Sequence, residues 1–442
     1  MILSYKALRA YIFRKYRGIS NYFRPGVSFK SERYKKLEAR VPKFELPNPL
    51  LTETGSIITN KESWSSGQRV KILNYYQRYI YGNSPFSFLK IGFSILSGDS
   101  YCLNGKALKK EVNIFNENKP GAYFRLLIIM PASTIEAGLK APVFLGLNFF
   151  GNQTITREKD ISVTESWLPN NSITLGRKAE SLRGIQLSSW PIRQIIDAGY
   201  ALATAYCGDI VPDKSDGIDL SIEHWFSKEE RHNFELGALG AIDGWAWGLR
   251  KAMDYIEQDE DLDASRVVVL GHSRLGKAAL WAGAQDPRFA IIISNESGCG
   301  GATLFRRRFG ETIASINQQY PHWFCQEFKK FNNRENELLV DQHELIGLIA
   351  PRPVYIASAQ RDLEADPYGE FLAAKNASTI YKLFGLIGLQ AEELPPVNTS
   401  IMGNIGYHIR SGCHGIKRFD WIQFIRFADK TFAQSSNNLH SV

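Results

Sequence analysis

Residues 267–277 read VVVLGHSRLGK, an apolar run followed by a short segment that has glycine at both ends and Ser273 in between. The apolar run predicts a strand buried in a sheet, and the residues after Ser273 predict the start of a helix. A serine at such a bend is typical of a nucleophile elbow, which lifts the hydroxyl above the sheet. Gly271 and Gly276 fit this pattern because the backbone is strained there and neighbouring chain packs close. The backbone amide of Arg274 can then point at a developing oxyanion.

The same glycines fit most of a second motif. Gly271, Gly276 and Lys277 match a phosphate-binding loop of the form G-x-x-x-x-G-K-[ST] up to its last position. Ala278 stands where that loop needs a hydroxyl for magnesium. The elbow also departs from its usual form, because G-x-S-x-x-G is one residue longer than G-x-S-x-G. We favour the nucleophile elbow and keep the nucleotide-binding loop, which predicts ATP binding, as the rival interpretation.

Strand and helix patterns alternate on both sides of this turn. Apolar runs predict strands at 124–130, 143–148, 198–206, 266–270, 289–294 and 354–357, and helical spacing predicts helices at 236–257 and 274–284. Residues 341–344 resemble a capping box that opens a further apolar helix. Alternation of this kind predicts an α/β fold with a doubly wound, mainly parallel sheet and helices on both faces, as in the α/β-hydrolases.

A nucleophilic serine needs a base and an acid, which follow it along this fold in the order serine, acid, histidine. Two carboxylates follow predicted strands, Glu296 and Asp362, and both can reach the same edge of a parallel sheet. His414 lies in a small-residue loop just before the last predicted helix, where a hydrolase base is held. His408 is the second candidate for the base.

Composition and charge exclude other classes of protein. The chain has 442 residues, 44% of them apolar and 22% charged, which excludes general disorder, collagen and coiled coil. The net charge of +8 comes from residues 1–43, which hold twelve Lys or Arg and two Asp or Glu, so the rest of the chain is near −2. A nearly neutral body argues against a nucleic-acid partner. We expect a basic, solvated arm and linker at 1–60, a catalytic domain at 61–437 and a tail at 438–442.

Targeting and cysteine patterns add little. The sequence has no apolar run long enough to cross a membrane and, as read, no export signal. The five cysteines are scattered without a C-x-x-C pair, which fits neither a disulfide scaffold nor a structural zinc site. Other polar and aromatic residues have structural interpretations: turn carboxylates at Asp209 and Asp213, core tryptophans at Trp245, Trp247 and Trp281, and structural histidines at His322 and His343.

At these residues the sequence resembles the glucuronoyl esterases, carbohydrate esterase family 15, and in particular their bacterial members. The elbow GHSRLGK (271–277) is similar to the family's G-C-S-R-x-G-K. The other similar blocks are ESGCGG (296–301), RRRFGET (306–312), YPHWF (320–324), DQHE (341–344) with APR (350–352), and GYHIR (406–410) leading to His414. The resemblance covers about residues 60–437.

The resemblance implies an α/β-hydrolase that cleaves the ester between 4-O-methyl-glucuronate on xylan and lignin alcohols. It implies Ser273 as nucleophile, His414 as base and Glu296 as acid, with Asp362 in the more usual hydrolase position as the alternative acid. The remaining implied roles are Arg274 at the oxyanion and Lys277 and Glu311 at the sugar hydroxyls; Trp323, in a loop, is our candidate for lining the pocket. No metal or organic cofactor is expected, and the substrate implies a periplasmic or secreted location.

Two departures from the family pattern bear on function. His272 replaces the cysteine before the serine, so the disulfide of fungal members cannot form here. Glu364 stands where bacterial members commonly carry a tryptophan that packs against the sugar. A carboxylate at that position favours an alternative carbohydrate ester as substrate, such as acetyl xylan. A catalytically idle carbohydrate-binding protein on the same scaffold is the third hypothesis.

Overall fold

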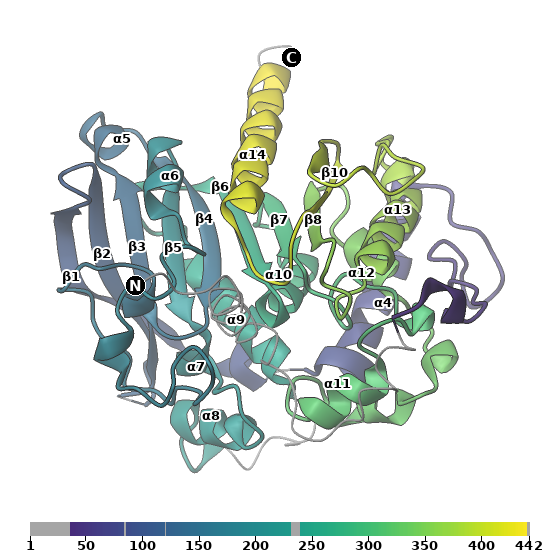
Figure 1. Cartoon of the computed structure of the whole chain (residues 1–442), viewed down its shortest axis with the longest axis horizontal. Helices are drawn as coiled ribbons and strands as arrows, with labels where there is room; N and C mark the ends of the chain where they lie inside the picture. The colour runs from purple at the N-terminus through teal and green to yellow at the C-terminus, as the bar shows by residue number, and fades with distance from the viewer. Residues whose placement is uncertain (1–35, 84, 120, 231–238, 440–442) are drawn as a thin grey trace, which may run out of the picture.

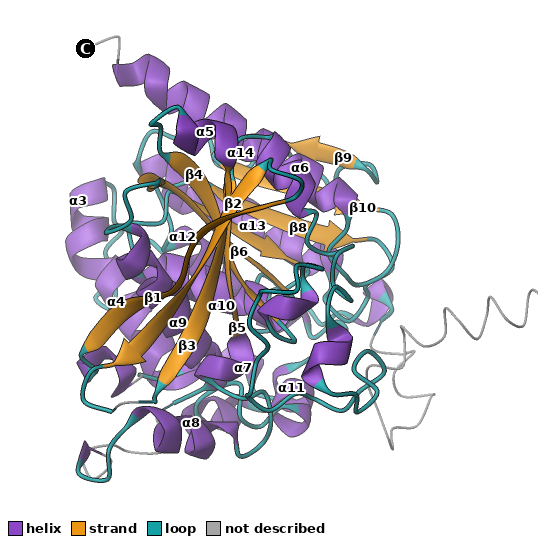
Figure 2. Cartoon of the chain, turned by 90° about the vertical axis from the view of Figure 1, so that its left-hand side faces the viewer, coloured by secondary structure: helices purple, strands orange, loops and turns teal. Residues whose placement is uncertain are grey.

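The computed structural model describes residues 36–83, 85–119, 121–230 and 239–439, with side chains up to residue 434. One sheet runs through these residues in the order β1-β2-β3-β5-β4-β6-β7-β8-β10-β9. Figure 1 shows the sheet crossing the molecule, and Figure 2 shows its strands fanning across one another as the sheet twists. The N-terminal strands therefore form one side of the molecule and the C-terminal strands the other.

The centre of the sheet is parallel and its edges are antiparallel. The pairings β5–β4, β4–β6, β6–β7, β7–β8 and β8–β10 are parallel, whereas β1–β2, β2–β3, β3–β5 and β9–β10 are antiparallel. The strands are β1 (Ile91–Cys102), β2 (Ala107–Asn116), β3 (Tyr123–Pro131), β4 (Ala141–Asn148), β5 (Ala201–Tyr206), β6 (Leu262–His272), β7 (Ile291–Asn295), β8 (Val354–Ala359), β9 (Thr399–Ile401) and β10 (Ile405–Arg410). The predicted mainly parallel sheet is confirmed, and the antiparallel edges were not predicted.

Helices cover both faces of the sheet, as predicted. They are α3 (Lys61–Ser63), α4 (Arg69–Tyr76), α5 (Ala132–Glu136), α6 (Ile192–Asp197), α7 (Cys207–Ile210), α8 (Gly217–Trp225), α9 (Ala241–Ile256), α10 (Arg274–Gln285), α11 (Ile313–Gln319), α12 (Gln342–Gly347), α13 (Pro367–Leu383) and α14 (Arg418–Leu439). Side chains of α9, α10, α12 and α13 share one apolar core, whereas those of α6 and α14 belong to a second. The capping box at Asp341 is present at the start of α12.

Strand β6 explains why the sequence around 267 is so apolar. Val267 and Val269 belong to one core, whereas Val268 and Leu270 belong to the other. Successive side chains of a strand point to opposite faces, so a strand covered on both faces needs apolar residues at every position. Each such burial stabilises the fold by about 1.5–3 kcal/mol. Apolar side chains on both faces thus place β6 in the middle of the sheet, and its end fixes where the turn with Ser273 begins.

The N-terminal segment divides into two parts. Residues 1–35 lie outside the described residues, so the predicted solvated arm stays a prediction. The part that the structure describes touches the body: Glu38 accepts hydrogen bonds from both terminal nitrogens of Arg307, at 3.0 and 2.9 Å, and the Pro47 carbonyl lies 3.0 Å from Nε2 of His343. Within the described residues no helix has the length and apolar character needed to cross a membrane.

The turn after β6 has the tight geometry that its glycines predict. Ser273 has φ 57° and ψ −130°, which is a strained conformation for a residue with a side chain. A Cβ at Gly271 would lie 2.0 Å from the carbonyl oxygen of Leu275, and one at Gly276 would lie 3.0 Å from that of Gly271. The backbone of the turn therefore folds back on itself, and the space leaves room only for hydrogen at position 271.

Replacing Gly271 by alanine should lower the free energy of unfolding by about 3 kcal/mol or more, because the added methyl group meets backbone that cannot rotate away. Gly98→Ala is the matched control, since a Cβ at Gly98 in β1 meets nothing within 4 Å. Urea denaturation of both variants checks this. Equal midpoints for the two variants would show that the turn is looser than described.

Candidate active site

The candidate nucleophile stands between a central strand and the helix that follows it. Ser273 joins β6 to α10, and its backbone N–H donates to the carbonyl of Asn295 at the end of β7, at 2.9 Å. Its carbonyl accepts from the backbone N–H of Gly276 at 2.9 Å. The serine is therefore fixed from both sides of the turn, at the carboxyl edge of the parallel strands.

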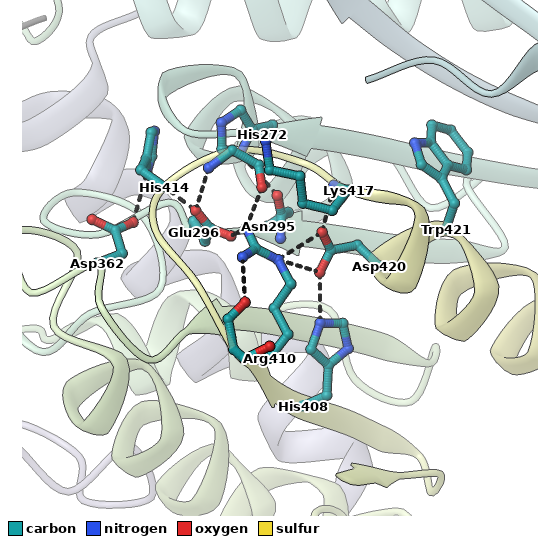
Figure 3. A network of polar contacts seen from close by, with 12 residues as sticks. His272, Asn295, Glu296, Asp362, His408, Arg410, His414, Lys417, Asp420 and Trp421 are labelled. Atoms are coloured by element: carbon teal, nitrogen blue, oxygen red, sulfur yellow. Dashed lines mark hydrogen bonds and ion pairs between the residues drawn. The ribbon is translucent and has the colours of Figure 1, made fainter. Parts of the chain in front are cut away.

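His414 lies between two carboxylates at the same edge. Its Nδ1 is 2.5 Å from Oδ2 of Asp362 and 3.2 Å from Oε2 of Glu296 (Figure 3). Glu296 follows β7, Asp362 follows β8, and His414 lies in the loop between β10 and α14. The structure thus brings together the predicted base and both candidate acids, and it places Asp362 closer to the ring than Glu296.

Burial and charge separate the two carboxylates. Burial raises the pKa of Glu296, and the neighbouring His414 and Arg410 only partly offset this. Burial acts in the same direction on Asp362, but the charge of His414 and the hydrogen bond with it hold the pKa of Asp362 below its usual value. Burial by itself would lower the pKa of His414, yet Asp362 and then Glu296 outweigh it and raise that pKa. Asp362 therefore holds its negative charge more firmly than Glu296 does.

Arg410 anchors the Glu296 side of the site. Arg410 is 2% exposed and donates through Nη2 to Oε1 of Glu296, while its Nε lies 2.9 Å from Oδ2 of Asp420 (Figure 3). It also donates to carbonyl oxygens of the loop after β10, at Ser411, Cys413 and Gly415. One buried cation thus fixes the acid, the loop that carries His414 and the start of α14. Sequence reasoning missed this role.

His408, the second candidate for the base, lies in the core of the structure. It is fully buried in β10, with Nε2 at 2.8 Å from Asp420 (Figure 3). Its Nδ1 lies 2.9 Å from the Tyr355 hydroxyl. Both ring nitrogens are thereby occupied. Its hydrogen bonds indicate a role in holding Asp420, and through it Arg410.

His272 lies directly beside the predicted base. Its ring centroid is 4.5 Å from that of His414, and its Nδ1 lies 2.8 Å from Oδ1 of Asn295. Burial and then the nearby His414 lower the pKa of His272 well below its usual value, which keeps the ring neutral. Because His272 immediately precedes Ser273, this contact brings His414 to the turn that carries the serine.

The guanidinium of Arg274 is held by a carboxylate that we expected to be a simple turn residue. Its Nε is 2.6 Å from Oδ2 of Asp213, and the group lies over the ring of Phe149 at 4.5 Å. The other oxygen of Asp213 accepts from His322 Nε2 at 2.9 Å and from Trp323 Nε1 at 2.7 Å. Burial would raise the pKa of Asp213, but Arg274 and His322 lower it overall. Asp213 therefore orients three groups of the site.

Lys277, which is buried in α10, forms an ion pair with the partly exposed Glu311. The ammonium of Lys277 donates to the carbonyls of Ser297 at 2.5 Å and Cys299 at 2.6 Å, and lies 3.9 Å from Glu311. Burial lowers the pKa of Lys277 and raises that of Glu311 to about 7. Lys277 is therefore committed largely to the loop after Glu296, and Glu311, which is 21% exposed, is the member of the pair that faces solvent.

The last two predicted site residues differ in exposure. Trp323 is buried, whereas Glu364 lies at the surface, at a position that we call the rim of the site. Trp323 is 4% exposed and stacks on Tyr320 with ring centroids 3.7 Å apart, while Lys277 lies 5.6 Å from its centroid. Glu364 has a 45% exposed side chain and pairs with Lys36 of the N-terminal segment at 2.5 Å. Its carbonyl accepts from the backbone N–H of Glu311 at 3.1 Å. The departure at 364 is therefore charge-balanced by a residue that sequence reasoning assigned to an arm.

Comparison with known proteins places these residues in context. A protein-family model with the description glucuronyl esterase, fungi, matches residues 232–385 of this chain. A carbohydrate esterase from an unknown prokaryotic organism is 46% identical over 399 residues, which is 89% of this chain and 90% of that protein. A 4-O-methyl-glucuronoyl methylesterase of Podospora anserina is 38% identical over 129 residues, 27% of each chain.

Solved structures give the same result over most of the chain. A glucuronoyl esterase from Solibacter usitatus has a TM-score of 0.83 and 42% identity, covering 89% of this chain and 99% of that one. A structure described as a promiscuous CE15 esterase from the marine bacterial metagenome has a TM-score of 0.82 and 44% identity, covering 89% and 98%.

Replacing Arg410 by methionine should lower the free energy of unfolding by about 3–5 kcal/mol, because two buried carboxylates would lose their shared cation. Arg361→Met, at an exposed position after β8, should change it by less than about 0.5 kcal/mol. Urea denaturation near neutral pH measures both. A small effect at 410 would mean that water or another group replaces the guanidinium.

Proposed function

The chain belongs to carbohydrate esterase family 15, the glucuronoyl esterases, and from this premise we propose that it hydrolyses esters of 4-O-methyl-glucuronic acid, such as those joining xylan to lignin alcohols. It is a carboxylic ester hydrolase. The observation that carries the proposal is the imidazole of His414, held by two carboxylates beside the residue that precedes Ser273.

In the proposed reaction Ser273 attacks the ester carbon while its hydroxyl proton passes to His414. The resulting oxyanion collapses, the alcohol leaves with the proton from His414, and the sugar acid stays bound to Ser273 as an ester. Water, deprotonated by His414, then attacks this acyl-enzyme and releases the acid. Asp362 and Glu296 hold the ring and stabilise the imidazolium that forms in both halves.

The oxyanion would be stabilised at the start of α10. The first backbone N–H groups of a helix carry partial positive charge and lack partners within the helix. Arg274 adds a guanidinium, which Asp213 orients and which lies over Phe149. Preorganised donors of this kind stabilise charge that develops only in the transition state.

Charge at the rim is compatible with an acidic sugar product. A lone carboxylate at Glu364 would repel a uronate, but Lys36 lies 2.5 Å from it and balances its charge. Glu311, facing solvent beside Lys277, is our candidate for binding sugar hydroxyls. These contacts support a glucuronoyl ester as substrate.

A second candidate function is hydrolysis of another carbohydrate ester, such as acetyl xylan. It is favoured by the description of one 44% identical structure as a promiscuous CE15 esterase. Rates on acetylated xylan and on benzyl glucuronate separate the two candidates.

Ser273→Ala should reduce kcat on benzyl glucuronate by at least about 10³-fold, because the acyl-enzyme cannot form. Ser265→Ala, at an exposed position in β6, is the control and should keep the wild-type rate. Labelling with a fluorophosphonate should mark the wild type and Ser265→Ala but not Ser273→Ala. An unlabelled wild type would favour an idle carbohydrate-binding protein instead.

Asp362→Asn should move the rising limb of kcat/KM against pH to lower pH, by about 1–3 units. His414 must be neutral to accept the serine proton, and the nearby negative charges raise its pKa, so removing the larger of them lets the ring lose its proton at lower pH. Glu296→Gln should shift the limb in the same direction by less. The variant with the larger fall in kcat identifies the working acid, and an unmoved limb in both would exclude His414 as the titrating base.

A further inference from the structure

Three side chains beside the elbow offer metal-ligating atoms close to one another. A ring nitrogen of His272, a ring nitrogen of His414 and a carboxylate oxygen of Glu296 all lie within 4.8 Å of each other. We propose that these residues form a zinc site through which Zn²⁺ reversibly inhibits the enzyme. Binding of the ion stands on this geometry alone, whereas the inhibition rests on the proposed role of His414 as base.

His272 is prepared to act as a ligand. In its neutral form one ring nitrogen carries a proton and the other a lone pair. Nδ1 is taken by the hydrogen bond to Oδ1 of Asn295 at 2.8 Å, so Nε2 is left to bind an ion. A hydrogen bond at the far nitrogen is the arrangement that orients zinc-ligating histidines in proteins. Asn295 ends β7, so this ligand is fixed by a central strand.

Glu296 supplies a rigid anionic ligand. Its carboxylate is buried, with Oε1 held by Arg410 and Oε2 2.8 Å from the backbone N–H of Gly415. Oε2 is also the oxygen that faces His414, at 3.2 Å. An ion placed between the rings would therefore meet a fixed carboxylate oxygen, with no change in the position of β7.

His414 is the ligand that can move and that an ion can reach from solvent. Its side chain is 38% exposed, and it lies in the loop of residues 411–417 rather than on a strand. Zinc bonds are about 2.0–2.2 Å long, so ligand atoms up to 4.8 Å apart must draw together slightly. A rotation of the exposed His414 ring would close this gap, whereas His272 and Glu296 are held in place by their hydrogen bonds.

The ligand set favours zinc over harder cations. Two imidazoles and one carboxylate form the three-ligand set of a zinc site with an open fourth position for water, whereas magnesium and calcium prefer oxygen ligands. Zinc on Nε2 of His414 would take the lone pair that accepts the serine proton, whereas zinc on Nδ1, the nitrogen that faces Glu296, would displace the contact with Asp362 and leave the ring proton on Nε2. In either case the ring could not accept the proton of Ser273. The rate of ester hydrolysis would therefore fall while zinc is bound and recover when a chelator removes it.

Calorimetric titration of chelator-treated Ser273→Ala with ZnCl₂ tests the site without any need for activity. We expect one Zn²⁺ per chain, with affinity about 10- to 100-fold weaker in the double variant that adds His272→Phe. Adding His272→Gln in place of His272→Phe keeps a polar contact with Asn295 and guards against loss of packing. His224→Gln, at an exposed histidine of α8, is the matched control and should bind as the parent does.

Two further readouts connect binding to function. Co²⁺ titrated into Ser273→Ala should give the visible absorption of a four-coordinate site, and the His272 variants should lose it. With otherwise wild-type sequence, the ratio of rates with and without zinc should approach one in the His272 variants. No saturable binding in Ser273→Ala, or affinity unchanged by both His272 substitutions, would overturn the site. Binding as expected without inhibition of an active enzyme would overturn the inhibitory role alone.

Discussion

The candidate site depends on one buried ion pair, Arg410 with Glu296. Arg410 is the last residue of β10 and Glu296 directly follows β7, and these strands are not neighbours in the sheet because β8 lies between them. The guanidinium also holds Asp420 and the carbonyls of the loop that carries His414. Burying charge is costly unless partners are close and hydrogen bonds are complete, so this pair tolerates few arrangements of the loop. Because the buried pair needs all of its hydrogen bonds, it also fixes the position of His414.

The two carboxylates beside the imidazole of His414 differ in how firmly each keeps its charge and in how each is held by the fold. Asp362 lies closer to Nδ1 and keeps its charge, because His414 stabilises the ionised form against the effect of burial. Glu296 is more deeply tied into the fold, through Arg410 and Gly415, and burial raises its pKa. One carboxylate is therefore suited to electrostatic support and the other to holding the loop in register. This division follows from where the strands end.

Sequence patterns predicted the parts of the structure that are local. The apolar run at 267–270 predicted β6, and the glycines predicted the strained turn, because both depend on contacts within a few residues. The antiparallel edge β1–β3 was not predicted. Exposed residues interrupt the apolar pattern of β1, and an apolar pattern does not show in which direction a strand runs. Arg410 and Asp213 were also missed. A single arginine in a strand, or an aspartate after a proline, gives no signal until distant segments meet.

The two departures from the family pattern acquire meaning only from such distant contacts. In the sequence Glu364 is an unbalanced charge, yet Lys36, more than three hundred residues earlier, lies against it. Two residues after Lys36, Glu38 pairs with Arg307. His272 reads as a neutral replacement for cysteine, yet it lies against His414 from the other end of the domain. The charge balance at Glu364 and the second imidazole beside His414 are therefore properties of the folded chain. A substitution that looks unfavourable within its own motif can be compensated wherever the fold brings a partner, so the motifs alone do not define the charge and the ligating groups around this site.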